Sequence, residues 1–164
     1  MLERLFVGVL GNRNSGKSTT SNTLFGATVR TGQYPRTLTL YDGECVEVFV
    51  ISGSPEERHL YAGDIPKKTG MPHRALFALI HRGGTSDARF RDRGGLRYLR
   101  AMVKPRPNDA GENNDQLGLM PWLLGHGATV AMRDGQVPPG SRTEEIRQFI
   151  HSWAKAHGLT LACR

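Results

Sequence analysis

The chain has 164 residues, of which 38% are hydrophobic and 23% charged. This balance predicts one globular domain over residues 1–164 and excludes an intrinsically disordered chain. No apolar run approaches the roughly 20 residues of a membrane-spanning helix, and the N-terminus carries no recognisable export signal. The net charge of +7 is compatible both with an acidic partner and with a solvated basic surface that has no specific partner.

The only two cysteines, Cys45 and Cys163, form no CxxC pair. Their isolation favours two free thiols in a reducing compartment, and a single disulfide is the alternative. Together with the missing membrane span, this predicts a cytoplasmic protein.

The first part of the chain is predicted to contain three strands and two helices. A buried strand is predicted at Leu5–Leu10, followed by a helix at Lys17–Gly26. The two strands of a hairpin follow at Arg36–Tyr41 and Cys45–Ile51, and then a short helix at Ser54–Tyr61. Asp42 and Gly43 are the tight-turn signal of the hairpin. Gly26 is expected to end the first helix, and Val46, Val48 and Val50 are expected to share one face of their strand.

The rest of the chain alternates strands with helices and loops. Strands are predicted at Ala75–His81, Ala128–Met132 and Leu159–Cys163, and helices at Gly95–Val103, Asp115–Leu124 and Ser141–His157, of which the last is amphipathic. An Arg-rich loop is predicted over 83–95 and a connector over 104–115. The amphipathic helix has an apolar stripe of four residues: Ile146, Phe149, Ile150 and Trp153. Ser141 or Thr143 is expected to cap it. These patterns predict a three-layer α/β fold, whose mostly parallel six-stranded sheet has one antiparallel edge hairpin.

Residues 11–19 carry a phosphate-binding motif. Gly11, Gly16, Lys17 and Ser18 fit G-x-x-x-x-G-K-[ST] between a predicted strand and a predicted helix. The glycines let successive N–H groups point at phosphate oxygens, and the helix adds its positive end. Lys17 is expected to bridge the outer phosphates and Ser18 to supply one Mg²⁺ ligand. The predicted nucleotide contacts are Gly11, Asn12, Arg13, Asn14, Ser15, Gly16, Lys17, Ser18 and Thr19.

The stretch GNRNSGKSTTSNTLFG resembles the opening of Era-like and Ras-like P-loop GTPases. Asn14, Asn22, Leu24 and Gly26 stand at that family's positions, and the resemblance covers residues 1–60. It implies a P-loop NTPase fold that binds GTP or ATP with Mg²⁺. It also implies that a threonine closes over Mg²⁺ and the terminal phosphate: Thr37, with Thr31 and Thr39 as alternates. Thr37 is also typical of an ordinary β-branched strand residue.

Two motifs of that family are incomplete in this chain. The position of D-x-x-G reads ISGSPEE over residues 51–57, so Ser52 replaces the aspartate as a candidate partner of a Mg²⁺-bound water. The position of the base-reading motif reads MRDG over residues 132–135. Asp134 is there a candidate contact to the base, or simply a turn residue. The missing carboxylate predicts slow intrinsic hydrolysis.

The segment 82–100 is rich in arginine: Arg82, Arg89, Arg91, Arg93, Arg97 and Arg100. Such a segment suits an arginine finger, a lid over phosphates, nucleic-acid backbone contact, or a solvated loop. The leading hypothesis is a nucleoside-triphosphate-binding switch with slow or partner-activated Mg²⁺-dependent hydrolysis, whose catalytic residues are Lys17, Ser18 and Thr37. The alternatives are a small nucleotide or metabolite kinase with an Arg-rich lid, and a non-catalytic adaptor that binds an acidic partner.

Overall fold

The computed structural model describes residues 4–11, 16–30, 35–51, 75–81, 96–103, 121, 124–125, 129–133 and 137–164. Its elements in chain order are β1 (Arg4–Gly11), α1 (Lys17–Phe25), β2 (Arg36–Thr39), β3 (Glu44–Ile51), β4 (Ala75–His81), β5 (Leu96–Val103), β6 (Thr129–Arg133), α4 (Gly140–Ala156) and β7 (Leu161–Ala162). None of the helices in these ranges has the length and apolar character that crossing a membrane requires.

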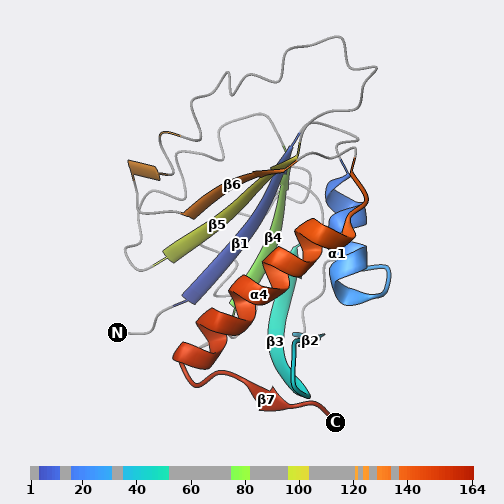
Figure 1. Cartoon of the computed structure of the whole chain (residues 1–164), viewed down its shortest axis with the longest axis vertical. Coiled ribbons are helices and arrows are strands. Elements are labelled where there is room, and N and C mark those ends of the chain that lie inside the picture. The colour runs from blue at the N-terminus through green and yellow to red at the C-terminus, as the bar shows by residue number, and fades with distance from the viewer. Residues whose placement is uncertain are drawn as a thin grey trace.

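The strands form one sheet, in which six follow the order β2-β3-β4-β1-β5-β6 (Figure 1). The pairs β1/β4, β1/β5, β3/β4 and β5/β6 are parallel, whereas β2 and β7 run antiparallel to β3. Cys45 of β3 pairs with Thr39 of β2 on one side and with Leu161 of β7 on the other. Since β4 joins β3 only from Val48 onward, β7 covers the part of that edge that β4 leaves open.

The predicted three-layer P-loop fold around a six-stranded sheet is wrong. The sheet has seven strands, and its antiparallel part is the three strands β2, β3 and β7 rather than one edge hairpin. The two helices that the structure describes along their length, α1 and α4, lie on the same face of the sheet (Figure 1).

The additional strand is β5, at Leu96–Val103, where the sequence pattern predicted a helix. A segment of this length, in which Arg97 and Arg100 interrupt the apolar residues, fits either structure, and local periodicity does not separate the two. The decisive contacts are long-range, because β5 lies between β1 and β6 and pairs with both.

The hydrophobic core lies between the helices and one face of the sheet. From the sheet it takes alternate residues of β1 and β3: Leu5, Val7, Val9, Val46, Val48 and Val50. This confirms that the three valines share a face. The predicted stripe of α4 is also confirmed, because Ile146, Ile150 and Trp153 are buried and Phe149 packs against them.

Several local predictions are confirmed. Asp42 and Gly43 have φ angles of 55° and 72°, and the Glu44 amide donates to the Tyr41 carbonyl over 2.8 Å, as a tight hairpin turn requires. Gly26 ends α1 with a φ of 64°. The predicted strands near residues 5, 75, 128 and 159 correspond to β1, β4, β6 and β7.

The predicted cap of α4 is wrong. The N-cap is Pro139, and no side chain makes a capping hydrogen bond there. The Thr143 hydroxyl instead donates to the Gly140 carbonyl over 2.8 Å inside the first turn. The predicted helix Ser54–Tyr61, loop 83–95 and connector 104–115 lie outside the described residues, as does most of the predicted helix Asp115–Leu124.

Cys45 and Cys163 form a disulfide, so the expectation of two free thiols is wrong. Their Cα atoms are 5.2 Å apart across the β3–β7 pair, although 118 residues separate them in the chain. The Cys163 amide also donates to the Gly43 carbonyl over 2.8 Å. The two thiols meet because β7 returns to β3, a long-range contact that cysteine spacing does not reveal.

Candidate phosphate-binding site

The candidate site lies where β1 ends and α1 begins. Gly11 is the last residue of β1, and Gly16 is the N-cap of α1 with a φ of 84°. This left-handed conformation favours glycine, so Gly16 supplies a backbone bend that the motif needs. The predicted strand before the motif and the helix after it are confirmed. Residues 12–15, with the predicted contacts Asn12, Arg13, Asn14 and Ser15, lie outside the described residues.

Lys17, Ser18 and Thr19 are the first three residues of α1. The amides of a first helical turn have no acceptor within the helix, and the helix dipole makes this end positive. The turn contains no acidic residue that would offset this charge. Ser18 and Thr19 are exposed, and Lys17 is half-buried. The arrangement therefore offers amide donors, hydroxyl groups and a lysine to an anion.

Thr20 fixes the geometry of this turn. It is fully buried, and both its amide and its hydroxyl donate to the Gly16 carbonyl, over 2.9 and 3.0 Å. The same hydroxyl accepts a 2.8 Å hydrogen bond from Nε of Arg142, near the start of α4. Arg142 is only 4% exposed, and its Nη1 also donates to the Val137 carbonyl over 2.7 Å. The last glycine of the motif is thus connected to α4 through two side chains.

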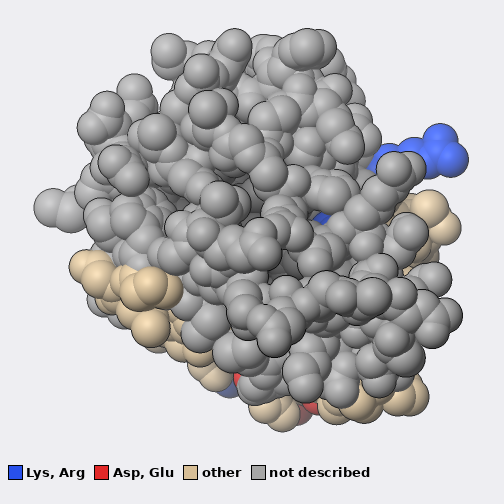
Figure 2. All heavy atoms as spheres, turned by 90° about the horizontal axis from the view of Figure 1, so that it is seen from above, with Lys and Arg blue, Asp and Glu red and all other residues tan. Residues whose placement is uncertain are grey.

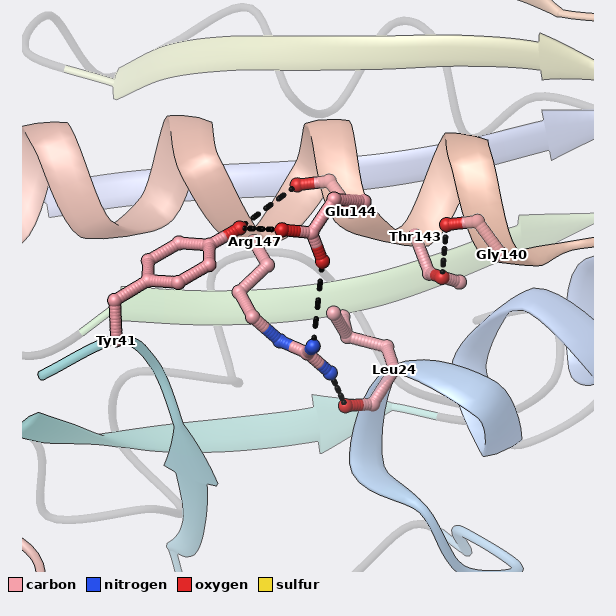
Figure 3. A network of polar contacts seen from close by, with 6 residues as sticks. All are labelled: Leu24, Tyr41, Gly140, Thr143, Glu144 and Arg147. Atoms are coloured by element: carbon pink, nitrogen blue, oxygen red, sulfur yellow. Dashed lines mark hydrogen bonds and ion pairs between the residues drawn. The ribbon is translucent and has the colours of Figure 1, made fainter. Parts of the chain in front are cut away.

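The last turn of α1 is also held by α4, through Arg147 (Figure 3). Its Nη2 donates to the Leu24 carbonyl over 2.8 Å, and its Nη1 lies 3.4 Å from the Glu144 carboxylate. On the other side of Glu144, the Tyr41 hydroxyl donates to the carboxylate. Partial burial, followed by this hydrogen bond, raises the pKa of Tyr41 to about 12.

A third polar contact joins α4 to the hairpin. The Glu44 carboxylate lies 2.5 Å from Nε2 of His151 and 3.8 Å from Nζ of Lys155, and it accepts a 3.1 Å hydrogen bond from the Thr160 hydroxyl. The hydrogen bond from His151 is the main cause that lowers the pKa of Glu44. This cluster lies beside the disulfide, since Cys45 follows Glu44 in β3.

Thr37 lies within β2 and is exposed, opposite Glu47 of β3. Its neighbour Leu38 is buried in the core with Leu24 of α1, so Thr37 lies on the face of β2 away from α1. No contact described in the structure joins Thr37 to Ser18. The other candidates, Ser52 and Asp134, lie outside the described residues.

The described residues offer few ligands for a metal ion. They contain no group of three or more His, Cys, Asp or Glu residues that is placed to hold a metal ion. The exposed hydroxyl of Ser18 is an oxygen donor of the kind that Mg²⁺ accepts, alongside phosphate oxygens and water. Ser18 therefore fits the role of one Mg²⁺ ligand.

The Arg-rich segment is described only in part. Arg97 and Arg100 lie on β5, inside the sheet, and not on a loop or helix, while the other four arginines lie outside the described residues. Figure 2 shows the molecule from the end at which β1 finishes. In this view a described basic side chain projects at one side.

The sequence patterns did not single out Arg142, although they contained a signal for it. Arg142 stands four residues before Ile146, and so on the apolar stripe of α4. A charged residue on the buried stripe of an amphipathic helix needs polar partners inside the protein. The structure supplies two of them, at Thr20 and Val137.

Comparisons of the chain with protein-family models, with curated proteins and with solved structures found no match. The function is therefore inferred from the residues of the site itself.

Proposed function

We propose that the chain binds a nucleoside triphosphate, GTP or ATP, together with Mg²⁺, at the start of α1. One observation carries the proposal: Lys17 and Ser18 of the G-x-x-x-x-G-K-[ST] motif open a helix directly after the left-handed Gly16. Helix amides, glycine backbone and a lysine are together the groups that bind phosphate oxygens in such loops.

Each residue of the turn has a role in this proposal. Lys17 contacts the outer phosphates, the Thr19 amide or hydroxyl contacts an inner phosphate, and Ser18 holds Mg²⁺. Bound Mg²⁺ supplies positive charge against the phosphate oxygens. Because Ser52 stands where the related motif has a carboxylate, we expect the isolated chain to hydrolyse slowly and an activating partner to accelerate it. The chain then acts as a nucleotide-dependent switch.

The proposal includes a cytoplasmic location. Free thiols at Cys45 and Cys163 no longer support this location, because the two cysteines form a disulfide and disulfides are rare in reducing compartments. The redox state of Cys45 and Cys163 in freshly lysed, alkylated cells tests this part. Two alkylated thiols support the cytoplasm, and a persistent disulfide contradicts it.

The binding experiment is a calorimetric titration with ATP, GTP, ADP and GDP, with and without Mg²⁺. We expect Lys17→Met to weaken triphosphate binding about 10- to 100-fold, because a charged hydrogen bond is worth roughly 1.5–3 kcal/mol. Lys155→Met is the matched control: it also removes a lysine, but one that is 61% exposed beside Glu44 of the hairpin. Absence of binding by the wild-type chain, or equal binding by Lys17→Met, overturns the proposal.

Hydrolysis is tested separately by phosphate release from Mg²⁺-GTP and Mg²⁺-ATP. We expect well under one turnover per second from the isolated chain. Many turnovers per second would contradict the slow, partner-dependent reaction.

A further inference from the structure

Two arginines of α4 hold α1 at its two ends. Arg142 donates to the side chain of Thr20 in the first turn, and Arg147 donates to the backbone carbonyl of Leu24 in the last. Both contacts are guanidinium hydrogen bonds of 2.8 Å between the same two helices. The two contacts differ in the part of α1 to which the accepting residue is connected.

Beyond Thr20 lies the phosphate-binding motif. The guanidinium of Arg142 can only donate, so its Nε occupies a lone pair of the Thr20 hydroxyl. The proton of that hydroxyl then remains for the Gly16 carbonyl, 3.0 Å away. The two hydrogen bonds therefore run from the Arg142 guanidinium to the Thr20 hydroxyl and from that hydroxyl to the Gly16 carbonyl. Gly16, the final acceptor, is the residue with the left-handed backbone conformation.

Burial protects these two hydrogen bonds from competition by water. Thr20 is fully buried and Arg142 is 4% exposed, so water competes little for either side chain. A buried hydroxyl that already has a donor and an acceptor holds one orientation. The Gly16 carbonyl, which also accepts the first hydrogen bond of α1, is therefore fixed from two sides.

We propose that Arg142 is a positioning residue of the phosphate-binding site. It orients the Thr20 hydroxyl and, through it, the Gly16 carbonyl, so that the first amides of α1 are arranged for phosphate before the ligand arrives. Preorganised donors bind more tightly because no ordering cost remains at binding. The inference rests on the proposed function, and it adds a residue from the far end of the chain to the same site.

The test measures binding of inorganic tripolyphosphate with Mg²⁺, a probe that needs only the phosphate contacts. We expect Arg142→Met and Thr20→Val each to weaken binding about tenfold, and the double variant to be little weaker than either alone. Thr20→Val removes only the hydroxyl from a side chain of nearly the same shape, so it remains informative if Arg142→Met does not fold.

Arg147→Met is the matched control, because it also removes a guanidinium that joins α4 to α1. We expect it to lower the free energy of unfolding while leaving tripolyphosphate binding within about twofold, since its contact is at the opposite end of α1. A merely structural role for Arg142 would make the two arginine variants alike in both measurements.

The outcomes separate the two proposals. If the wild-type chain binds tripolyphosphate and Thr20→Val binds it equally well, the positioning role is overturned while the proposed function stands. The same holds if Arg147→Met weakens binding as much as Arg142→Met. If the wild-type chain binds neither tripolyphosphate nor nucleotide, the proposed function fails, and this inference fails with it.

Discussion

The two ends of α4 are held in different ways. Near its first turn, Arg142 reaches the start of α1 through buried hydrogen bonds that lead to the glycine motif. In its second half, His151 contacts Glu44 of the hairpin, beside the disulfide between Cys45 and Cys163. The contacts of the first end are therefore all non-covalent, whereas the hairpin beside the second end is joined covalently to Cys163.

This difference separates the part of the molecule that a covalent bond stabilises from the part that carries the candidate site. A covalent bond between distant segments stabilises the fold without any ligand. A site that binds and releases an anion instead needs donors that stay available, as the first amides of α1 do. A single helix, α4, therefore contacts the disulfide-bonded hairpin at one end and the candidate site at the other.

Removal of the disulfide has the largest expected effect on stability. A disulfide that spans 118 residues restricts the unfolded chain and is worth about 3–5 kcal/mol. We expect the Cys45→Ala, Cys163→Ala double variant to lose this much free energy of unfolding in urea. Its affinity for Mg²⁺-tripolyphosphate should stay unchanged if the two ends act independently.

Wild-type protein in dithiothreitol is the control for that variant, because it loses the same bond without a change in sequence. Weaker tripolyphosphate binding in both preparations would show that the two ends of α4 are coupled and do not act independently.

Tyr41→Phe tests the contact between the hairpin and Glu144, in the first half of α4. The pKa of Tyr41 is about 12 in the folded protein and 10 as its ordinary value. As the pH rises, Tyr41 therefore loses its phenol proton in the unfolded chain before it does so in the folded protein. The contribution of Tyr41 to the free energy of unfolding is fully present below pH 10 and is lost as the pH rises toward 12. We expect Tyr41→Phe to cost about 1 kcal/mol at pH 7 and to flatten the alkaline decline. Urea unfolding between pH 7 and 11.5 measures both effects, and parallel curves for the two proteins would contradict the assignment.

Glu44→Gln should give the smallest effect, because the Glu44 side chain is 26% exposed and solvent partly screens its charge. The pKa of Glu44 is lowered from 4.5 in the folded protein, so the unfolded chain takes up the proton first as the pH falls. The stabilisation is present above pH 4.5 and is lost below it. Thermal unfolding between pH 3 and 6 should show a flatter acid decline in Glu44→Gln. An unchanged decline would remove Glu44 as its source.

The sequence predicted those features of the fold that are encoded within a few residues. The turn at Asp42 and Gly43 follows from two residues that tolerate positive φ, and the end of α1 follows from Gly26. The apolar stripe of α4 is likewise a local pattern of spacing. In the candidate site, the same local chemistry predicted the glycine bend and the helix that begins at Lys17.

Features that depend on distant partners were missed or wrong. Leu96–Val103 became a strand because β1 and β6 lie beside it, and neither neighbour is visible in the segment's own periodicity. The disulfide required β7 to return to β3. Arg142 entered the site only because α4 packs on α1, which places its guanidinium against Thr20.

The pairing of Cys45 with Cys163 also sets an order in time during synthesis. Ribosomes add about 5–20 residues per second, so roughly 6–24 s pass between the addition of the two cysteines, whose sequence separation is 118. Throughout that interval Cys45 has no partner cysteine in the growing chain. The hairpin strands are therefore made before their disulfide can form, and other thiols can compete for Cys45 until Cys163 is added.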